Sequence, residues 1–303
     1  MGNEHFWSAA LSRSSEALEH GALIPLTTSR LQCPGPGGEH FELRQLNAQL
    51  PRHHRPEGPK PNPFRPWDSE LEIEAIGLEH VLILNKYPVQ LGHMLLITRQ
   101  WAPQVHWLTF ADWNALVQVD RDTSGLWFFN SGPKAGASQP HRHLQLLRRP
   151  NGETSCPREG WFCSLLAKRS AQQSGGTDDV LMNSCVVAQR PNHADPVQEA
   201  RVLHGLYRSL AMGLALGDAE TERAPLAPYN LLLTPDWMAL IRRRQERSSG
   251  FSLNALGFAG YLLATENSDL DWLERNGGER LLQKVVSQIS DATDDSESSM
   301  TSG

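Results

Sequence analysis

Residues 130–145 carry the most information in this chain and read NSGPKAGASQPHRHLQ. Their first part is rich in Gly, Ser and Pro, which predicts a loop whose backbone N–H groups bind phosphate oxygens. Their second part predicts a strand that starts at His141. Because side chains two residues apart share one face of a strand, His141, His143 and Gln145 are expected on the same face. One face of this strand therefore presents two imidazoles and an amide beside a phosphate-binding loop.

The His-x-His pattern by itself has two other interpretations, a pair of metal ligands or a surface pattern without function. A zinc site needs further Cys, His or carboxylate ligands, and Gln145 is a poor ligand. His53 and His54 are neighbours in the sequence, so they point to opposite faces of an extended chain and are weak metal candidates. The loop and Gln145 together favour phosphate chemistry, and we predict no metal site made by the protein alone.

Hydrophobic patterns on both sides of this motif predict an α+β fold. The expected strands of the first half are short and consecutive, which is typical of an antiparallel sheet and not of a βαβ repeat. In the first half we expect helices at 6–18 and 110–119 and strands at 71–76, 80–84, 93–98, 126–129 and 143–147. In the second half we expect a strand at 180–188, a helix across 197–210, a hairpin at 229–234 and 237–241, a strand at 257–265 and two helical segments up to about 289.

The composition along the chain predicts three regions. Residues 1–179 form a first region that contains the central motif and ends in a stretch (151–179) with a helix beside a mobile linker. Residues 180–289 form a second region. Residues 290–303 are almost all Ser, Asp, Thr and Glu, so this tail cannot bury enough apolar area to fold and we expect it to be disordered.

The overall composition excludes several classes of function. The chain has 303 residues, 39% of them hydrophobic, which suffices for a globular core. Its net charge of −6 means that it lacks the basic field that drives nucleic-acid binding, so any phosphate is bound locally. Four irregularly spaced cysteines predict neither disulfides nor a CxxC metal site. With no signal peptide and no apolar run approaching ~18 residues, we expect a soluble cytoplasmic protein that binds no membrane; the oligomeric state stays open, with a monomer favoured.

Three further blocks of sequence stand out beside the central motif. They are Asn85-Lys86-Tyr87-Pro88 with Gly92-His93-Met94-Leu95-Leu96, Tyr229-Asn230-Leu231-Leu232-Leu233-Thr234, and Asn254-Ala255-Leu256-Gly257-Phe258-Ala259-Gly260. With His-x-His-x-Gln at 141–145, the chain resembles the ATP adenylyltransferases, or diadenosine tetraphosphate (Ap4A) phosphorylases, in the transferase branch of the histidine-triad superfamily. The resemblance covers most of the chain. It implies a histidine-triad-like antiparallel sheet with packed helices, extended by a C-terminal α/β segment of related type. It also implies that residues 1–179 are the catalytic region and that residues 180–289 complete the substrate pocket.

The resemblance implies a role for each matching residue. It makes His143 the nucleophile and Gln145 a donor to the phosphate under attack, with a backbone carbonyl near His141 orienting the nucleophilic ring. The further substrate-binding residues that it implies are Lys60, Asn85, Lys86, Asn130, Gly136, Ala137, Ser138, Gln139, Asn254, Ala255, Leu256 and Tyr261. Two positions depart from the family's pattern, since Ala137 stands where Ser is common and Arg243 lacks the usual preceding Pro.

The implied reaction is a reversible phosphorolysis of Ap4A to ATP and ADP, through AMP bound covalently to His143. A neutral imidazole attacks the α-phosphorus when its other nitrogen is held as a hydrogen-bond donor. The amide of Gln145 can hold a phosphoryl oxygen but cannot act as a base, so the intermediate is expected to wait for phosphate. The implied partners are a dinucleoside polyphosphate, inorganic phosphate, ATP and ADP. We also expect Mg²⁺ or another divalent cation with the substrate phosphates, and no organic cofactor.

Two other functions fit the same central motif. A hexose-1-phosphate uridylyltransferase-like enzyme also uses His-x-His-x-Gln, although the blocks at 229–234 and 254–260 resemble the adenylyl branch. A nucleotide-binding sensor without turnover is the second alternative, and the intact His143 and Gln145 argue against it. Nucleotide release measured with and without phosphate separates these functions.

Overall fold

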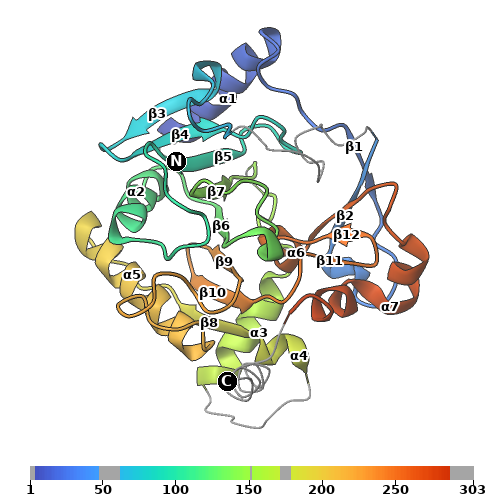
Figure 1. Cartoon of the computed structure of the whole chain (residues 1–303). Helices are drawn as coiled ribbons and strands as arrows, with labels where there is room; N and C mark the ends of the chain where they lie inside the picture. Colours follow the sequence, from blue (N-terminus) through green and yellow to red (C-terminus); the bar gives the residue numbers. More distant parts are fainter. Residues whose placement is uncertain (1–3, 48–61, 151, 171–178, 287–303) are drawn as a thin grey trace, which may run out of the picture.

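An eight-stranded antiparallel sheet forms the centre of the structure (Figure 1). The structure is a computed structural model, and it describes residues 4–47, 62–150, 152–170 and 179–286. In spatial order, the strands are β3 (Glu72–Ile76), β4 (His80–Leu84), β5 (Met94–Thr98), β7 (His143–Leu147), β6 (Leu126–Asn130), β9 (Tyr229–Leu233), β10 (Trp237–Arg242) and β8 (Cys185–Gln189). Strand β6 pairs directly with β9, so one sheet joins the two halves of the chain. The predicted α+β class and its antiparallel sheet are confirmed.

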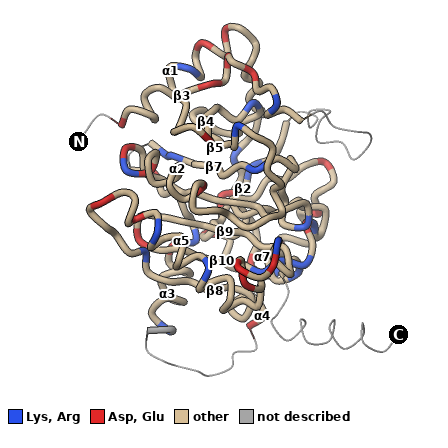
Figure 2. Tube along the Cα trace, turned by 60° about the vertical axis from the view of Figure 1, so that its left-hand side comes forward, with Lys and Arg blue, Asp and Glu red and all other residues tan. Residues whose placement is uncertain are grey.

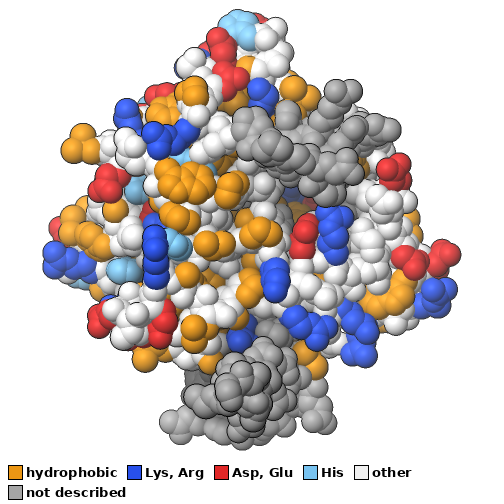
Figure 3. All heavy atoms as spheres, viewed as in Figure 1, with side chains coloured by type: hydrophobic (Ala, Val, Ile, Leu, Met, Phe, Trp, Pro, Cys, Tyr) orange, Lys and Arg blue, Asp and Glu red, His pale blue; other side chains and the backbone are white. Residues whose placement is uncertain are grey.

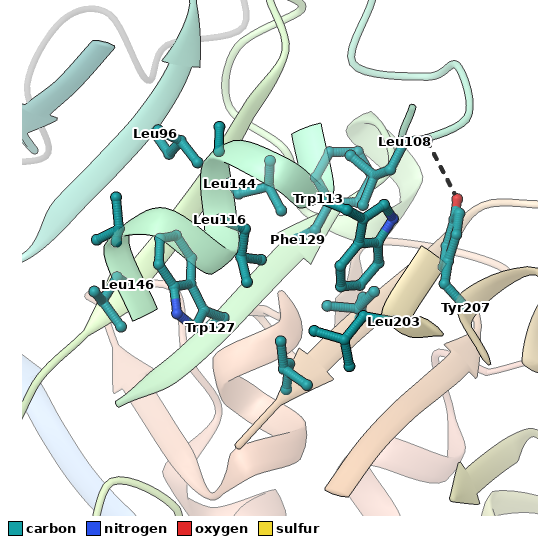
Figure 4. Packing of buried hydrophobic residues seen from close by; sticks show 14 of the residues in the cluster. Leu96, Leu108, Trp113, Leu116, Trp127, Phe129, Leu144, Leu146, Leu203 and Tyr207 are labelled. Atoms are coloured by element: carbon teal, nitrogen blue, oxygen red, sulfur yellow. Dashed lines mark hydrogen bonds between the residues drawn. The ribbon is translucent and has the colours of Figure 1, made fainter. Parts of the chain in front are cut away.

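Three helices cover one face of this sheet. They are α1 (His5–Glu19), α2 (Phe110–Asp120) and α5 (Pro196–Gly213). Trp113 of α2 lies in one buried cluster with Trp127 and Phe129 of β6, between the helices and the sheet (Figure 4). Helix α2 begins where Thr109 and Asp112 form a reciprocal capping box, which satisfies two of the free backbone N–H groups at its start. This layer fixes which face of each strand is buried.

The opposite face of the sheet carries two separate hydrophobic clusters. Phe64 packs with side chains of β4 and β5 in the smaller cluster, and the larger cluster lies over β6, β9 and β10. Strand β7 runs between these regions. Because Leu144 and Leu146 belong to the helix-covered core, the alternate positions His143 and Gln145 lie on the face between the two clusters. The fold therefore places the central motif at the boundary of two packed layers.

A second, three-stranded sheet and several helices cover the larger cluster. In this sheet β2 lies between β1, to which it is antiparallel, and β13, to which it is parallel. The strands outside the main sheet are β1 (Thr28–Leu31), β2 (Glu42–Leu46), β13 (Tyr261–Ala264) and the small hairpin β11 (Arg247–Ser248) and β12 (Phe251–Ser252). The remaining helices are α3 (Glu159–Ser170), α4 (Val180–Asn183), α6 (Ala255–Ala259) and α7 (Leu270–Gln283).

Two of the predicted strands begin with a helical turn instead. The segment 180–188 opens with α4, because the Asp179 carboxylate accepts hydrogen bonds from two backbone N–H groups, and only then continues as β8. The segment 257–265 opens with the end of α6, which stops at Gly260 with φ of +107°, and continues as β13. Strands β1, β2, β11 and β12 were not predicted. The other expected strands and helices are confirmed within three residues, except that α7, which is broken at Gly277, ends earlier than expected.

Acidic and basic residues are both distributed along the described chain (Figure 2), and both lie on the face drawn in Figure 3. That the chain binds no nucleic acid stays a prediction. Within the described ranges, no helix is long and apolar enough to cross a membrane. Within the segment 151–179, where a helix and a linker were expected, α3 confirms the helix, and residues 151 and 171–178 lie outside the described residues. The expected tail at 290–303 also lies outside them, and the division of the chain near residue 179 stays a prediction.

Candidate active site

His143 is held in one orientation by the backbone just before its strand, β7. Its Nδ1 lies 2.8 Å from the backbone oxygen of His141, so Nδ1–H donates to this carbonyl and Nε2 carries the lone pair. This is the carbonyl partner that the resemblance implied. Burial lowers the pKa of His143 to about 4, although the bond to the His141 carbonyl raises it in part. The imidazole is therefore neutral near pH 7, with a nucleophilic nitrogen opposite its hydrogen bond.

The ring of His141 is fully occupied by its own neighbours. Its Nε2 lies 2.8 Å from the backbone oxygen of Thr98, and its Nδ1 lies 2.9 Å from the side-chain nitrogen of Asn62. The ring packs edge-on against Phe64 at 5.7 Å and Trp101 at 5.3 Å between centroids. Burial lowers the pKa of His141 as well. The structure thus brings the two histidines together, with the first in a supporting position and the second presenting a ring nitrogen.

A third histidine, His93, lies beside Gln145 and was not among the predicted site residues. The Asn85 side-chain oxygen accepts a hydrogen bond from the Tyr87 N–H at 3.2 Å, so its amide nitrogen faces Nδ1 of His93, at 3.2 Å. His93 Nδ1 is then an acceptor and Nε2 carries the proton. Burial lowers the pKa of His93 to about 4; a hydrogen bond with Gln145 raises it, and His143 lowers it. Nε2 has no other partner among the described residues, and its contact with Gln145 falls short of full hydrogen-bond geometry.

The sequence held one signal for His93. It stands two residues before Leu95, which pairs with Gln145 across β5 and β7, so period two puts His93 on the same sheet face as Gln145. Asn85, predicted as a substrate contact, reaches Gln145 only through this histidine. The predicted strand pair before the motif therefore places the hydrogen-bonded side chains of Asn85 and His93 beside the amide of Gln145.

The loop that follows Asn130 uses several of its N–H groups internally. The Ala135 and Ala137 N–H groups donate to the Gly132 carbonyl, at 2.9 and 3.0 Å, and the Gly136 N–H donates to the Pro133 carbonyl at 2.9 Å. These three groups are therefore not available for phosphate, which corrects the predicted nest of backbone donors. Further along the loop Ser138 is exposed, and the buried side-chain oxygen of Gln139 has no partner among the described residues.

A buried polar network joins this loop to the second half of the chain. The Asn130 side-chain oxygen accepts hydrogen bonds from the Ala255 N–H, at 2.9 Å, and from the Asn230 amide, at 2.8 Å. The same Asn230 amide donates to the Ala135 carbonyl, and its oxygen accepts from the guanidinium of Arg243. Arg243 is 1% exposed, and burial lowers its pKa to about 9. The predicted residues Asn130 and Ala255 are thus in direct contact.

Glycine is required where the loop meets this network. Gly136 has φ of +87°, and a Cβ added there would lie 2.7 Å from the Cβ of Asn254. Asn254 in turn caps α6, because its side-chain oxygen accepts the Leu256 N–H at 2.9 Å. A larger side chain at position 136 would push the loop away from α6, so these predicted residues form one packed unit.

The remaining predicted residues make their contacts elsewhere. Lys86 lies 3.5 Å from the Asp68 carboxylate, and the Tyr261 hydroxyl donates to the Thr154 carbonyl at 3.1 Å. Lys60 lies outside the described residues. Among the described residues, these contacts of Lys86 and Tyr261 do not include His143.

Replacing Arg243 with methionine should lower the free energy of unfolding by about 2 kcal/mol, because buried carbonyls would lose a charged donor. Its guanidinium donates to the carbonyls of Gln245 at 2.8 Å, Leu253 at 3.0 Å and Val285 at 3.2 Å. Denaturant unfolding of the variant measures the loss. The matched control is Arg244→Met, whose side chain is exposed and which should stay close to the wild type. Equal losses in both variants would contradict the structural role of the buried residue.

The two buried imidazoles make stability depend on pH. The pKa values of His93 and His143 are lowered from 6.5 to about 4 in the folded chain. Between these two pH values, both imidazoles are therefore protonated in the unfolded chain and neutral in the folded chain. The free energy of unfolding should therefore fall as the pH drops from 6.5 towards 4. Denaturant unfolding at several pH values should show a shallower fall for His93→Asn. As control, His20→Asn should leave this fall unchanged, since Glu70 raises the pKa of exposed His20 and moves its proton uptake above 6.5. If the free energy of unfolding falls equally with pH in the wild type and in His93→Asn, the lowered pKa of His93 is refuted.

Two family models match the sequence and together span most of the chain. Residues 1–159 match the model described as the Ap4A phosphorylase N-terminal domain. Residues 165–288 match the model described as the ATP adenylyltransferase C-terminal domain. Both the central motif and the contacting residues of the second half fall inside these matches.

Curated proteins and solved structures agree with these models. The chain is 29% identical over 234 residues to diadenosine 5',5'''-P1,P4-tetraphosphate phosphorylase 2 of Saccharomyces cerevisiae, covering 69% of this chain and 70% of that protein. Its fold is similar to crystal structures of yeast Ap4A phosphorylase Apa2 in complex with AMP (TM-score 0.71, 24% identity) and with Ap4A (TM-score 0.67, 23% identity). Each of these two matches covers 94% of this chain and 98% of the other. Because the first family model alone spans more than half of its residues, the chain belongs to the Ap4A phosphorylase family of nucleotidyl transferases.

Proposed function

We propose that this chain transfers AMP from Ap4A to inorganic phosphate, releasing ATP and ADP, through a covalent AMP–His143 intermediate. The observation that carries the proposal is the state of His143, a buried neutral imidazole whose Nδ1 is bound to the His141 carbonyl. Such a ring offers Nε2 as a nucleophile without first losing a proton. The names of the yeast relatives support Ap4A as the substrate.

The first half-reaction forms the bond between nitrogen and phosphorus. Nε2 of His143 attacks the α-phosphorus of one adenosine, the bond from that phosphorus to the bridging oxygen breaks, and ATP leaves with this oxygen. The terminal phosphate of the leaving group ionises near ~6, so it needs little help from a general acid. Throughout, Nδ1–H keeps its bond to the His141 carbonyl, which stabilises the positive charge that develops on the ring.

The second half-reaction releases the nucleotide to phosphate. An oxygen of inorganic phosphate attacks the same phosphorus, the bond to His143 breaks, and ADP leaves with the neutral imidazole restored. The same two steps in reverse order make Ap4A from ATP and ADP, so we propose that the reaction is reversible. Because one site serves both steps, the kinetics should be ping-pong.

Gln145 is proposed to hold a phosphoryl oxygen in both steps. Since Nε2 of His93 carries the proton, it is the side-chain oxygen of Gln145 that faces this histidine. The Gln145 nitrogen is then left as a donor to the phosphoryl group. An amide cannot take a proton from water, so the intermediate is protected from hydrolysis until phosphate binds.

The loop and the start of α6 are proposed to bind the polyphosphate. The Ser138 hydroxyl, which is exposed, and the side-chain N–H groups of Gln139 are the proposed direct contacts, because both can donate to phosphate oxygens. Asn130, Gly136 and Ala255 hold the loop in place. Among the described residues, no group of three or more His, Cys, Asp or Glu side chains is arranged to hold a metal ion. A divalent cation such as Mg²⁺ would therefore be bound mainly by the substrate phosphates.

We also propose a cytoplasmic location. Cys33 and Cys156 are buried thiols outside any disulfide, and burial raises the pKa of Cys33 to about 11. Thiols of this kind fit a reducing compartment.

Incubation of the purified chain with Ap4A, with and without phosphate, tests the proposed function. With phosphate, ATP and ADP should appear in equal amounts over many turnovers. Without phosphate, product formation should stop after the first turnover, which releases only ATP. AMP with ATP at any phosphate concentration would indicate a hydrolase, and binding without products would indicate a sensor. A UDP-hexose with a hexose 1-phosphate is the matched substrate pair, and turnover of this pair alone would indicate a uridylyltransferase.

A further inference from the structure

The ladder between β6 and β7 stops short of the candidate site. The two strands pair from Leu126 opposite Leu147 to Phe128 opposite Gln145. The same register, continued by two residues, would place Asn130 opposite His143. The backbone groups of these two residues do not bond to each other there.

The side chain of Gln104 fills this position in the ladder. Its amide nitrogen donates to the carbonyl of Asn130 at 2.8 Å and to the carbonyl of His143 at 3.2 Å. Its oxygen accepts the backbone N–H of His143 at 2.9 Å. Because a flipped amide would set its oxygen against two carbonyls, these three partners fix the orientation of the side chain. The amide thus takes the place of a peptide group between the nucleophile's strand and the nucleotide loop.

The backbone holds Gln104 firmly at this point. Its N–H donates to the Pro140 carbonyl at 2.8 Å, and the neighbouring residues Pro103 and His141 form a β-bridge. Its side chain is buried, with 1% exposure for the residue. A buried amide whose two hydrogens and oxygen are all hydrogen-bonded is rigid. The Gln104 side chain therefore fixes the position of β7 at His143 relative to β6 at Asn130.

We propose that Gln104 is a positioning residue that sets the place of His143 relative to the nucleotide loop; this inference rests on the proposed function. Gln104 acts through the backbone of His143 and of Asn130, without touching substrate. Asn130 is in turn bound to Ala255 of the second half. The amide therefore links the attacking ring to the surface that holds the substrate, and its loss should impair the attack more than the binding. Misplacement of a reacting group by about 1 Å can cost roughly 10²-fold in rate.

The test compares Gln104→Met with Gln90→Met in otherwise wild-type protein. Gln90 also binds a backbone carbonyl with its amide, that of Arg148 at 2.9 Å, but it contacts neither His143 nor the loop. The readout is the single-turnover rate at which radiolabelled Ap4A, without phosphate, labels the protein. We expect Gln104→Met to lower this rate by at least roughly tenfold and Gln90→Met to leave it unchanged. In a His143→Ala background, Ap4A should bind with similar affinity whether or not Gln104 is replaced.

Gln104→Glu keeps the test decisive if the methionine variant does not fold. An ionised carboxylate cannot donate to the two carbonyls, whereas the protonated acid donates one hydrogen bond. The labelling rate of Gln104→Glu should therefore increase as the pH falls from 8 to 5.5. The labelling rate of the wild type, in which residue 104 is an uncharged amide, should not increase over the same interval. A purely structural role would not produce this recovery.

The outcomes separate the inference from its premise. A wild-type protein that takes no label overturns the proposed covalent function. A labelled wild type with equal rates for the folded methionine variant, or with a glutamate variant insensitive to pH, overturns the role of Gln104. A methionine variant that labels at the wild-type rate under saturation but binds Ap4A weakly would assign Gln104 to binding, which also contradicts the proposal.

Discussion

His143→Ala should lower the rate of Ap4A phosphorolysis by roughly 10⁴-fold, the scale seen when the group that carries a covalent path is removed. Alanine leaves no nitrogen at the position that the His141 carbonyl orients. Phosphate would then have to attack the α-phosphorus of Ap4A directly and displace ATP in one step, although the site positions an imidazole for that attack. Nucleotide binding should change much less, because the loop is anchored through Asn130 and Gly136 rather than through the nucleophile. Initial rates of ADP formation at saturating Ap4A measure the effect.

Trapping the intermediate provides the control for this result. Wild-type protein mixed with labelled Ap4A and quenched in denaturant should carry nucleotide that is lost in acid and kept in base, as expected of a phosphoramidate, while His143→Ala should carry none. His193→Ala replaces an exposed histidine and should keep both label and rate. If the folded His143→Ala protein retains a tenth of the activity, another residue is the nucleophile. A wild type that is active but never labelled would favour direct transfer.

Gln145→His should raise hydrolysis relative to phosphorolysis by roughly 10²-fold, since an imidazole at this position can take a proton from water, whereas the amide cannot. Position 145 lies on the same face as His143, two residues along β7, where a side chain reaches both the phosphoryl group and its acceptor. The new ring would also stand beside His93, whose burial favours neutral imidazoles. The measurement is the ratio of AMP to ADP formed from Ap4A at fixed phosphate.

Gln145→Asn is the matched control for this variant. It keeps an amide, shortens its reach and adds no base, so total activity should fall while the ratio of AMP to ADP stays as in the wild type. An unchanged ratio in a folded, substrate-binding Gln145→His protein would show that the amide does not protect the intermediate. Exclusion of water by the surrounding loops would then be the better explanation.

The strands of the main sheet could be predicted because each buries one face against helices. In β7, Leu144 and Leu146 alternate with His143 and Gln145, so period two reveals both the strand and its reactive face. Helix starts were harder, since the capping signal of Asp179 precedes an apolar run that also fits a strand. Strands β1 and β2 were missed because β2 gains its parallel partner, β13, only from the far end of the chain.

The candidate site was predicted in part. The direct contacts of Asn130 with Ala255 and of Gly136 with Asn254 agree with the residues that the resemblance brought together. The phosphate nest was wrong for three N–H groups, because a loop closes its own hydrogen bonds once it turns, and composition does not show which ones. Gln104 could not be found from spacing, since it lies 39 residues before the backbone to which it binds.

The sequence by itself determined which strand face carries His143 and Gln145, because the alternation of side chains along a strand is local geometry. Only the tertiary structure decided that His143 is neutral, that His93 faces Gln145, and that Gln104 completes the ladder beside His143. These properties depend on desolvation and on hydrogen-bond partners from distant parts of the chain. Packing brings those partners together, so no local pattern in the sequence records them.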